Sequence, residues 1–179
     1  MVFWKNVVGV LAIGLFAVTG FGCGSAQNAA QHDVWRVGTD ASYAPFGFQD
    51  ESSHEYVGYD IDIIRAIAAS QGHEVTIKNL NFDGLIPALQ TGDLDIAISD
   101  MTINEDRSRT VDFTDSYYKA GLSIVVRADE TRINNFDDLR GMHVGVTIGS
   151  TGAEVARAIP NADLHEFSTI SDAFLDLYN

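Results

Sequence analysis

The hydrophobic and polar positions of the chain follow the periods of alternating strands and helices. Residues 35–38 have a pattern typical of a strand, and residues 59–70 have the period of a helix. Asp60 is a suitable N-cap for that helix, and Gly72 is a suitable stop after it. The apolar residues that share one face of the helix are Ile61, Ile64, Ile67 and Ala68. The pattern predicts a strand followed by an amphipathic helix.

The same alternation repeats farther along the chain. We predict strands at residues 75–77 and 94–99, and between them a helix at residues 83–89 with Pro87 in its first turns and Gly92 as its stop. Successive strand–helix–strand units form right-handed crossovers and a largely parallel sheet. Ligands bind such sheets at the carboxyl ends of the strands. The predicted fold class is therefore α/β.

A second unit follows a β-rich run at residues 122–127. We predict that it opens with a short helix at residues 135–141 and a strand at residues 142–146. The remaining predicted elements are a helix at residues 151–159, a strand at residues 164–167 and a helix that opens at Ser171. No stop signal precedes Asn179. We therefore expect the chain to end inside its last helix.

The N-terminal segment has the layout of an export signal. Lys5 precedes an apolar run at residues 7–21, and small residues surround Cys23 directly after that run. Cys23 is the one cysteine of the chain, and its position resembles that of the acylated cysteine of a bacterial lipoprotein. We expect a signal peptide at residues 1–23, lipid on Cys23 and a polar tether at residues 24–33. Ordinary cleavage slightly later and a retained membrane anchor are the alternatives.

Composition and charge exclude several classes of function. A hydrophobic content of 46% with 20% charged residues is the balance of a globular protein. The formal net charge of −14, without a basic stripe, excludes nucleic-acid binding by counterion release. The histidines lack the spacing of a metal-binding motif, and no G-x-S-x-G motif offers a serine nucleophile. We expect no metal, no cofactor and no nucleic-acid partner.

Candidate chemistry lies in three polar segments that follow predicted strands, at residues 40–48, 99–107 and 147–152. In the second segment Thr102 and Arg107 flank a tight turn. A guanidinium there could bind a carboxylate through two parallel hydrogen bonds. This segment therefore points to a ligand that carries a carboxylate.

Ordinary helix and core chemistry gives an alternative interpretation of the same segments. Residues 102–105 and 151–154 both fit capping boxes, in which case Arg107 is a solvated helix residue. The small residues before the second box would also expose N–H groups suited to an anion. Tyr43 and Phe82 could wall a pocket, or they could be core aromatics. These residue patterns alone leave both interpretations open.

Six segments stand in a distinctive order and spacing. They are VGTDASYAPF at residues 37–46, VGYDID at residues 57–62, FDGLIPAL at residues 82–89, Met101-Thr102-Ile103 with Arg107, Asp112-Phe113, and Gly149-Ser150-Thr151-Gly152. Together they resemble the family 3 amino-acid-binding proteins of ABC importers. The resemblance extends from about Val34 to the last residue.

The resemblance implies a type II periplasmic-binding-protein clamshell of two βαβ lobes that close on a free amino acid. Lobe one would occupy residues 34–128, with a crossing near residues 125–129, and lobe two would begin at residues 129–179 and be incomplete in this chain. By position, the ligand-binding residues would be Asp40, Tyr43, Phe82, Asp100, Met101, Thr102, Arg107, Ser150 and Thr151. Family members continue past the end of this chain, so we expect the chain by itself to be unstable.

The residues in these positions have implied roles. Arg107 would bind the ligand α-carboxylate, assisted by Thr102 and by backbone amides around Thr151. Tyr43 and Phe82 would enclose the ligand side chain between their rings. The implied site thus combines a carboxylate clamp with an aromatic pocket.

Two carboxylates suggest the nature of the ligand. Asp40 would meet its polar end, and the backbone near Asp100 would help to hold its α-amino group. A small residue usually stands at the position of Asp100 in the family. Because carboxylates and aromatic faces both attract cations, we expect arginine, lysine or ornithine to be preferred over glutamine.

The resemblance also implies partners and a location. They are an ABC permease, the membrane through the lipid anchor, and the periplasm or cell envelope as the place of action. An enzyme on the same fold, a periplasmic cyclohexadienyl (prephenate or arogenate) dehydratase, is the alternative, with Asp40 and Asp100 as candidate general acids. We expect a binding protein and not an enzyme.

Overall fold

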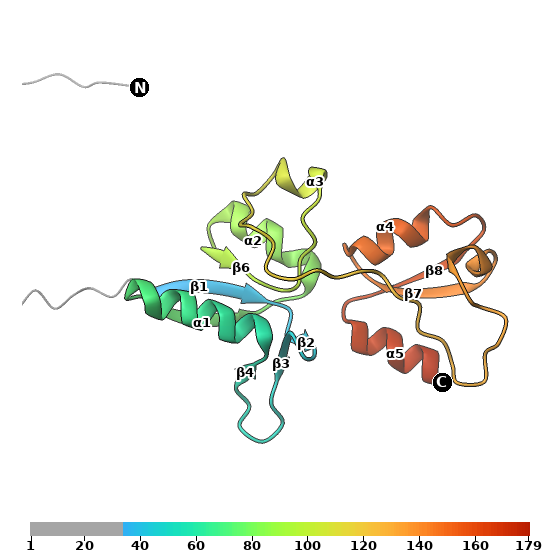
Figure 1. Cartoon of the computed structure of the whole chain (residues 1–179), viewed down its shortest axis with the longest axis horizontal. Helices are drawn as coiled ribbons and strands as arrows, with labels where there is room; N and C mark the ends of the chain where they lie inside the picture. The colour runs from blue at the N-terminus through green and yellow to red at the C-terminus, as the bar shows by residue number, and fades with distance from the viewer. Residues whose placement is uncertain (1–33) are drawn as a thin grey trace, which may run out of the picture. The chain divides into compact units, whose positions relative to one another are not determined.

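The computed structural model describes residues 34–179 (Figure 1). The predicted signal peptide, the lipid on Cys23 and the tether lie outside the described residues. Within residues 34–179, no helix is long and apolar enough to cross a membrane.

A three-stranded parallel sheet forms the centre of the first half of the chain. Its strands are β1 (Val34–Thr39), β5 (Glu74–Asn79) and β6 (Ile96–Ala97), with β1 in the middle. Val37 of β1 is fully buried and pairs with Ile77 and Ile96. The predicted strand at residues 94–99 is shorter than expected, because its ladder with β1 covers two residues.

Two helices pack on this sheet. Helix α1 (Tyr59–Gln71) places Ile64 against Val37, whereas α2 (Leu85–Thr91) places Leu85 close to Gly38, the next residue of β1. Neighbouring strand residues point to opposite faces, so the two helices cover opposite faces of the sheet. A 3-10 turn, η1 (Phe82–Gly84), leads into α2.

The helix ends confirm some of the predicted signals and correct one. Gly72 and Gly92 adopt the left-handed conformation at the C-caps of α1 and α2, as predicted. The N-cap of α1 is Gly58, so the prediction that Asp60 caps this helix was wrong. Asp60 lies in the first turn, fully buried, and accepts hydrogen bonds from other segments.

A small antiparallel sheet follows β1 and was not predicted. Its strands are β2 (Ser42–Tyr43), β3 (Gly47–Gln49) and β4 (Tyr56–Val57), in the order β2-β3-β4. They bring residues 42–49 back alongside residues 56–57 just before α1. The polar segment at residues 40–48 is thereby folded into a compact hairpin.

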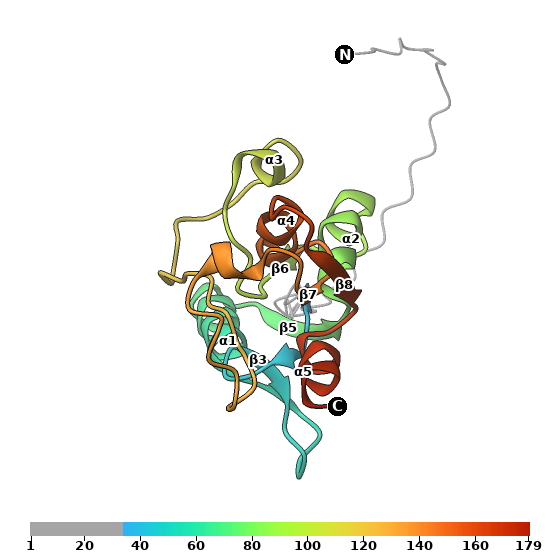
Figure 2. The ribbon, with the colours of Figure 1, turned by 90° about the vertical axis from the view of Figure 1, so that its right-hand side faces the viewer.

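The second half of the chain forms a separate parallel pair of strands. A 3-10 turn, η2 (Phe136–Leu139), precedes β7 (His143–Thr147), α4 (Thr151–Arg157), β8 (Asp163–Phe167) and α5 (Ile170–Tyr178). Residues Val144, Val146 and Leu164 pack with two alanines of α4, and Gly145 faces Ala173 of α5. The two helices therefore cover opposite faces of the β7-β8 pair (Figure 2).

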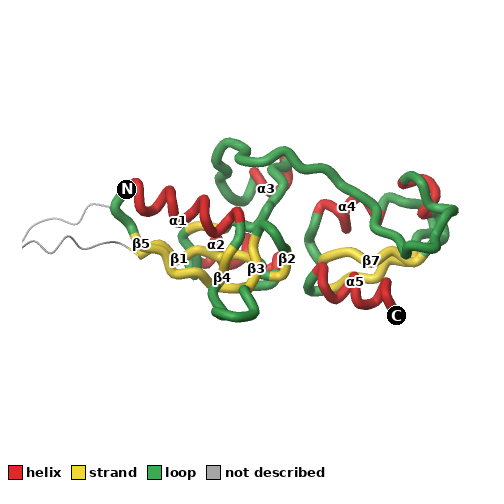
Figure 3. The backbone as a smooth tube through the Cα atoms, turned by 60° about the horizontal axis from the view of Figure 1, so that its bottom comes forward, coloured by secondary structure: helices red, strands yellow, loops and turns green. Residues whose placement is uncertain are grey.

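The stretch between β6 and β7 is mostly irregular (Figure 3). It contains the short helix α3 (Glu105–Ser108), after which no regular element begins until η2. The predicted strand at residues 122–127 is not observed. A strand needs a backbone partner, and within the described chain none pairs with this run. The predicted lobe boundary at residues 128/129 falls in this stretch and stays a prediction.

Candidate ligand-binding site

Arg107 is the centre of the candidate site, and α3 positions it. Asn104 caps this helix by accepting a hydrogen bond from the Arg107 backbone N–H at 2.9 Å. The alternative capping box that begins at Thr102 is therefore wrong. The Arg107 Nη1 group instead donates to the Thr102 carbonyl oxygen at 2.7 Å. The turn that precedes α3 thus holds the Arg107 side chain through a backbone carbonyl.

The Arg107 guanidinium also reaches the second half of the chain. Its Nη2 group donates to the carbonyl oxygen of Gly149 at 2.9 Å, and its Cζ lies 5.3 Å from the centre of the Phe82 ring. Arg107 thus joins the segment after β6, the turn before α2 and the segment after β7. The predicted neighbourhood of Arg107, Phe82 and the residues at 149–151 is present in the structure.

Burial makes this guanidinium electrostatically unusual. Arg107 is 7% exposed, and burial lowers its pKa while the negative charge of Glu154 opposes that shift. Within residues 34–179 no carboxylate lies within ion-pairing distance of it. Its two hydrogen bonds use backbone carbonyls and engage two of the five N–H donors of a guanidinium. A buried cation with donors to spare is suited to binding an anion.

The segment after β7 forms the other side of the site. Gly149 has a φ of 72°, and Ser150 caps α4 by accepting from the Ala153 N–H at 3.1 Å. The capping box that was an alternative at residues 151–154 is therefore wrong, because the cap is one residue earlier. The hydroxyls of Thr102 and Thr151 lie 3.5 Å apart. Two predicted ligand residues from distant parts of the chain are thus neighbours.

Tyr43 lies in a different aromatic group from Phe82. The Tyr43 ring stacks on Phe46 with 5.9 Å between centroids, and Phe46 meets Tyr118 edge-on at 5.0 Å. Tyr43 is 43% exposed, and within residues 34–179 its ring pairs with Phe46 and not with Phe82. The aromatic sandwich around the ligand stays a prediction.

Asp40 is largely occupied by its own turn. It is 7% exposed, and its Oδ1 accepts hydrogen bonds from the backbone N–H and the hydroxyl of Ser42, at 3.1 and 2.6 Å. Its backbone N–H donates to the Ser99 hydroxyl at 3.0 Å. The position after β1 is as predicted, but the carboxylate has a local structural role.

Asp100 is held by residues that the sequence did not mark as functional. Its φ of 46° is in the left-handed region, and its N–H donates to Asp60 Oδ2 at 2.8 Å and to the Tyr117 hydroxyl oxygen at 3.2 Å. Tyr117 in turn donates to Asp60 Oδ1 at 2.9 Å. Asp60 is one of the two acidic residues in the VGYDID segment, and that was the available signal for it. Nothing in the sequence around Tyr117 pointed to it.

Two carboxyl groups in this cluster have raised pKa values. Burial raises the pKa of Asp60, against the lowering effect of the hydrogen bonds from Tyr117 and the Asp100 N–H. Burial also raises the pKa of Asp100, and the charge of Asp60 adds to the effect. Met101, the next residue, is half-buried, and its predicted role in ligand binding stays a prediction.

Comparison with known proteins identifies the family of the chain. Residues 35–179 match the family described as bacterial extracellular solute-binding proteins, family 3. A probable histidine-binding protein of Campylobacter jejuni is 35% identical over 144 residues, which are 80% of this chain and 56% of that protein. The arginine-binding extracellular protein ArtP of Bacillus subtilis is 34% identical over 146 residues, 80% of this chain and 55% of that protein. The chain spans a little over half the length of these relatives.

Solved structures give the same result for the fold. An ancestral arginine-binding protein bound to arginine has a TM-score of 0.77 and 43% identity, over 82% of this chain and 66% of that chain. The ancestral amino acid-binding protein AncCDT-1, a precursor of cyclohexadienyl dehydratase, has a TM-score of 0.78 and 40% identity, over 81% of this chain and 65% of that chain. The predicted type II binding-protein fold is confirmed, with part of the second lobe covered.

Proposed function

Because this chain belongs to the bacterial extracellular solute-binding proteins of family 3, we propose that it captures a free amino acid outside the cytoplasm and presents it to an ABC permease. The carrying observation is Arg107, a buried guanidinium without a protein carboxylate within reach in residues 34–179. The α-carboxylate of an amino acid supplies the missing anion. A cation that is already desolvated binds such a group more strongly than an exposed arginine does.

The surroundings of Arg107 support a site that assembles from two segments. Gly149 accepts from the guanidinium, and Thr151 lies beside Thr102, so both segments can contact one small ligand. Ligand that binds better to the closed arrangement would shift the protein toward it, and the permease would recognise that state. The other proposed ligand contacts are Asp40, Tyr43, Met101 and Ser150.

For the ligand we propose a cationic amino acid. Asp100 is a partly buried carboxylate close to the segment that carries Thr102, and the ring of Phe82 is a cation-accepting face beside Arg107. Two relatives are named for arginine or histidine, which supports the proposal. An ancestral arginine-binding protein has also been solved with glutamine, so a neutral amide is the competitor to test.

For the location we propose export with lipid on Cys23, which would tether the protein to the membrane. Mass spectrometry of the exported protein should find a diacylated N-terminal Cys23. An unmodified chain that starts near Gln27 would contradict the anchor.

A dehydratase activity is the alternative, supported by the likeness to AncCDT-1 and by the raised pKa of Asp100. AncCDT-1 is itself described as an amino acid-binding protein, so the likeness favours binding equally. Turnover of prephenate, followed by absorbance, would favour the enzyme and contradict a pure binding role.

Calorimetry with arginine, lysine, histidine, glutamine and glutamate tests the proposed function. Arg107→Ala should weaken binding by about 1.5–3 kcal/mol, roughly 10- to 150-fold, the range for a hydrogen-bonded charge. Arg109→Ala is the matched control, because Arg109 is the C-cap of the same helix but is exposed and pairs with Glu105 and Asp106.

Arg107 also has structural contacts, so a second measurement separates binding from folding. The methyl ester of the preferred amino acid lacks the carboxylate and should bind the unaltered protein as weakly as the free amino acid binds the Arg107→Ala variant. Equal affinity for the ester and the acid would overturn the proposed carboxylate clamp, whatever the fold of the variant.

A further inference from the structure

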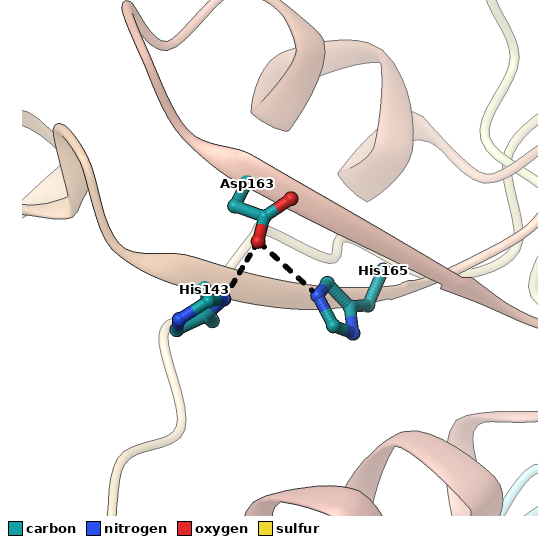
Figure 4. A group of neighbouring side chains, drawn as sticks. All are labelled: His143, Asp163 and His165. Carbon is teal, nitrogen blue, oxygen red and sulfur yellow. Dashed lines mark hydrogen bonds and ion pairs between the residues drawn. The ribbon is translucent and has the colours of Figure 1, made fainter.

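Three potential metal ligands gather on the β7-β8 pair, away from Arg107 and Phe82. His143 is the first residue of β7, and Asp163 and His165 belong to β8 (Figure 4). The parallel register pairs His143 with Asp163 and Gly145 with His165. Since side chains alternate between faces with a period of two, all three ligands project from the same face of the pair.

The three side chains meet at one carboxylate oxygen. His143 Nδ1 lies 2.8 Å from Asp163 Oδ2, and His165 Nε2 lies 3.4 Å from the same oxygen. The imidazole rings stand at 85° with 5.5 Å between centroids. One ligand atom from each residue can be chosen so that all three lie within 4.8 Å of one another. A single ion of ordinary radius can therefore contact all three after small side-chain rotations.

The strands that carry the ligands are well anchored. Val144, Val146 and Leu164 on the other face pack with Ala153 and Ala156 of α4. The ligand side chains themselves are exposed, with 81%, 61% and 45% of the side-chain surface accessible for His143, Asp163 and His165. The cluster thus combines a rigid backbone with side chains that solvent ions can reach.

We propose that His143, Asp163 and His165 form a binding site for Zn²⁺. Two imidazole nitrogens and one carboxylate oxygen are a ligand set that zinc accepts, and water would fill the remaining coordination position. The bound ion would join the starts of two parallel strands, whereas the candidate amino-acid site follows the carboxyl end of β7. This site is additional to the proposed function and does not depend on it.

The sequence did not reveal this site. His143 and His165 are 22 positions apart and fit no metal-binding spacing, so we expected no metal. Strand pairing removes that separation, because residues far apart in sequence become neighbours in the ladder. A search for ligands within one sequence motif cannot detect ligands that two paired strands supply together.

Titration calorimetry with ZnCl₂ on chelator-treated, tag-free protein tests the proposal. We expect one zinc ion per chain, and at least ~10-fold weaker binding in His143→Gln and Asp163→Asn, since even residues that support a ligand cost that much. Zinc should also raise the melting temperature of the unaltered protein but not of these variants. Cobalt should give a visible spectrum that both variants lose.

Three control variants identify the site. His54→Asn removes a histidine outside the cluster, and asparagine tolerates its positive φ of 58°, so this variant should keep full zinc affinity. Histidine and cysteine are residue types that zinc accepts, so His32→Asn and Cys23→Ser are further controls and should also keep full zinc affinity. Zinc affinity that is unchanged in His143→Gln, or lost in His32→Asn or Cys23→Ser, would overturn the proposal. So would an absence of zinc binding, or competition between zinc and the amino acid.

Discussion

Asp100 has a backbone conformation that residues with a side chain seldom adopt. Its φ of 46° is stabilised by hydrogen bonds from its N–H to Asp60 and Tyr117. The segment that leads to Thr102 and Arg107 begins at this residue. The cluster of Asp60, Tyr117 and Asp100 therefore fixes the direction in which the candidate site segment leaves β6.

Replacing Asp100 separates its charge from its conformation. Asp100→Gly keeps the left-handed conformation without strain and removes the carboxylate. If the charge pairs with a cationic ligand, arginine affinity should fall by about 1–3 kcal/mol with no loss of thermal stability. Calorimetry and a melt measure the two effects, and Asp106→Asn is the control for loss of charge, because the Asp106 side chain is exposed. Unchanged arginine affinity, or tighter glutamate than arginine binding in the unaltered protein, would exclude a cationic ligand.

Tyr117→Phe tests the hydrogen bonds that hold Asp60 and Asp100 together. The change removes a hydrogen bond to the Asp60 carboxylate and should raise the pKa of Asp60 further, because burial then acts with less opposition. A carboxyl group whose pKa is higher in the folded than in the unfolded protein stabilises the fold fully below its unfolded pKa of 3.8. That contribution is lost as the pH rises through the pKa of the folded protein. The variant should therefore lose about 1–3 kcal/mol at neutral pH and less in acid.

Urea unfolding at several pH values measures this dependence. Tyr118→Phe is the control, since Tyr118 is exposed and the hydrogen bonds to the Asp60 carboxylate come from Tyr117 and the Asp100 N–H. A deficit in Tyr117→Phe that is the same at every pH would show that packing, and not the Asp60 hydrogen bond, explains the loss.

At the scale of elements, hydrophobic periodicity predicted the helices and strands that bury one face against the rest of the fold. Helix α1 and strands β1, β5, β7 and β8 each have an apolar period that matches a buried face, and their positions were confirmed. Strands β2 to β4 are two or three residues long and have no period to detect, so their existence depends on pairing. The run at 122–127 has strand composition without a partner, which is why composition misled there.

The candidate site was likewise predictable from the sequence only in part. The motifs gave the residues that approach one another, such as Thr102 and Thr151, because family spacing encodes the loops after strands. They could not give the Arg107 bonds to the carbonyls of Thr102 and Gly149, nor the Asp60–Tyr117 pair, because those depend on coordinates across loops. The caps at Asn104 and Ser150 were missed by one or two residues for the same reason.

Gly58 connects the small antiparallel sheet to α1 and should not tolerate a side chain. Its φ is 121°, and a Cβ there would lie 2.4 Å from the carbonyl oxygen of Phe46. Gly58→Ala should cost about 1–3 kcal/mol of stability from strain, with more if the hairpin shifts. Gly84→Ala is the control, because Gly84 has an ordinary φ of −83° and open space around its Cβ. Equal melting temperatures for the two variants would contradict the clash.

On the scale of the whole molecule, the candidate site and the proposed zinc site share strand β7 and use its opposite ends. Residues that follow β1, β6 and β7 supply the proposed amino-acid contacts, as expected for parallel sheets. The zinc ligands stand at the starts of β7 and β8. One function can therefore be altered by mutation without changing the residues of the other.

The net charge of −14 should act on a cationic ligand before contact. Acidic residues give the surface a negative potential that attracts arginine, and salt screens it over a distance of ~30 Å at 0.01 M but ~10 Å at 0.1 M. The association rate of arginine, measured by stopped-flow, should fall by up to about 10-fold across this range. Glutamine has no net charge and should associate at a nearly constant rate, which makes it the internal control. Equal salt dependence for the two amino acids would show that the acidic surface does not steer the ligand, and it would leave Asp100 and the Phe82 ring as the proposed sources of a cationic preference.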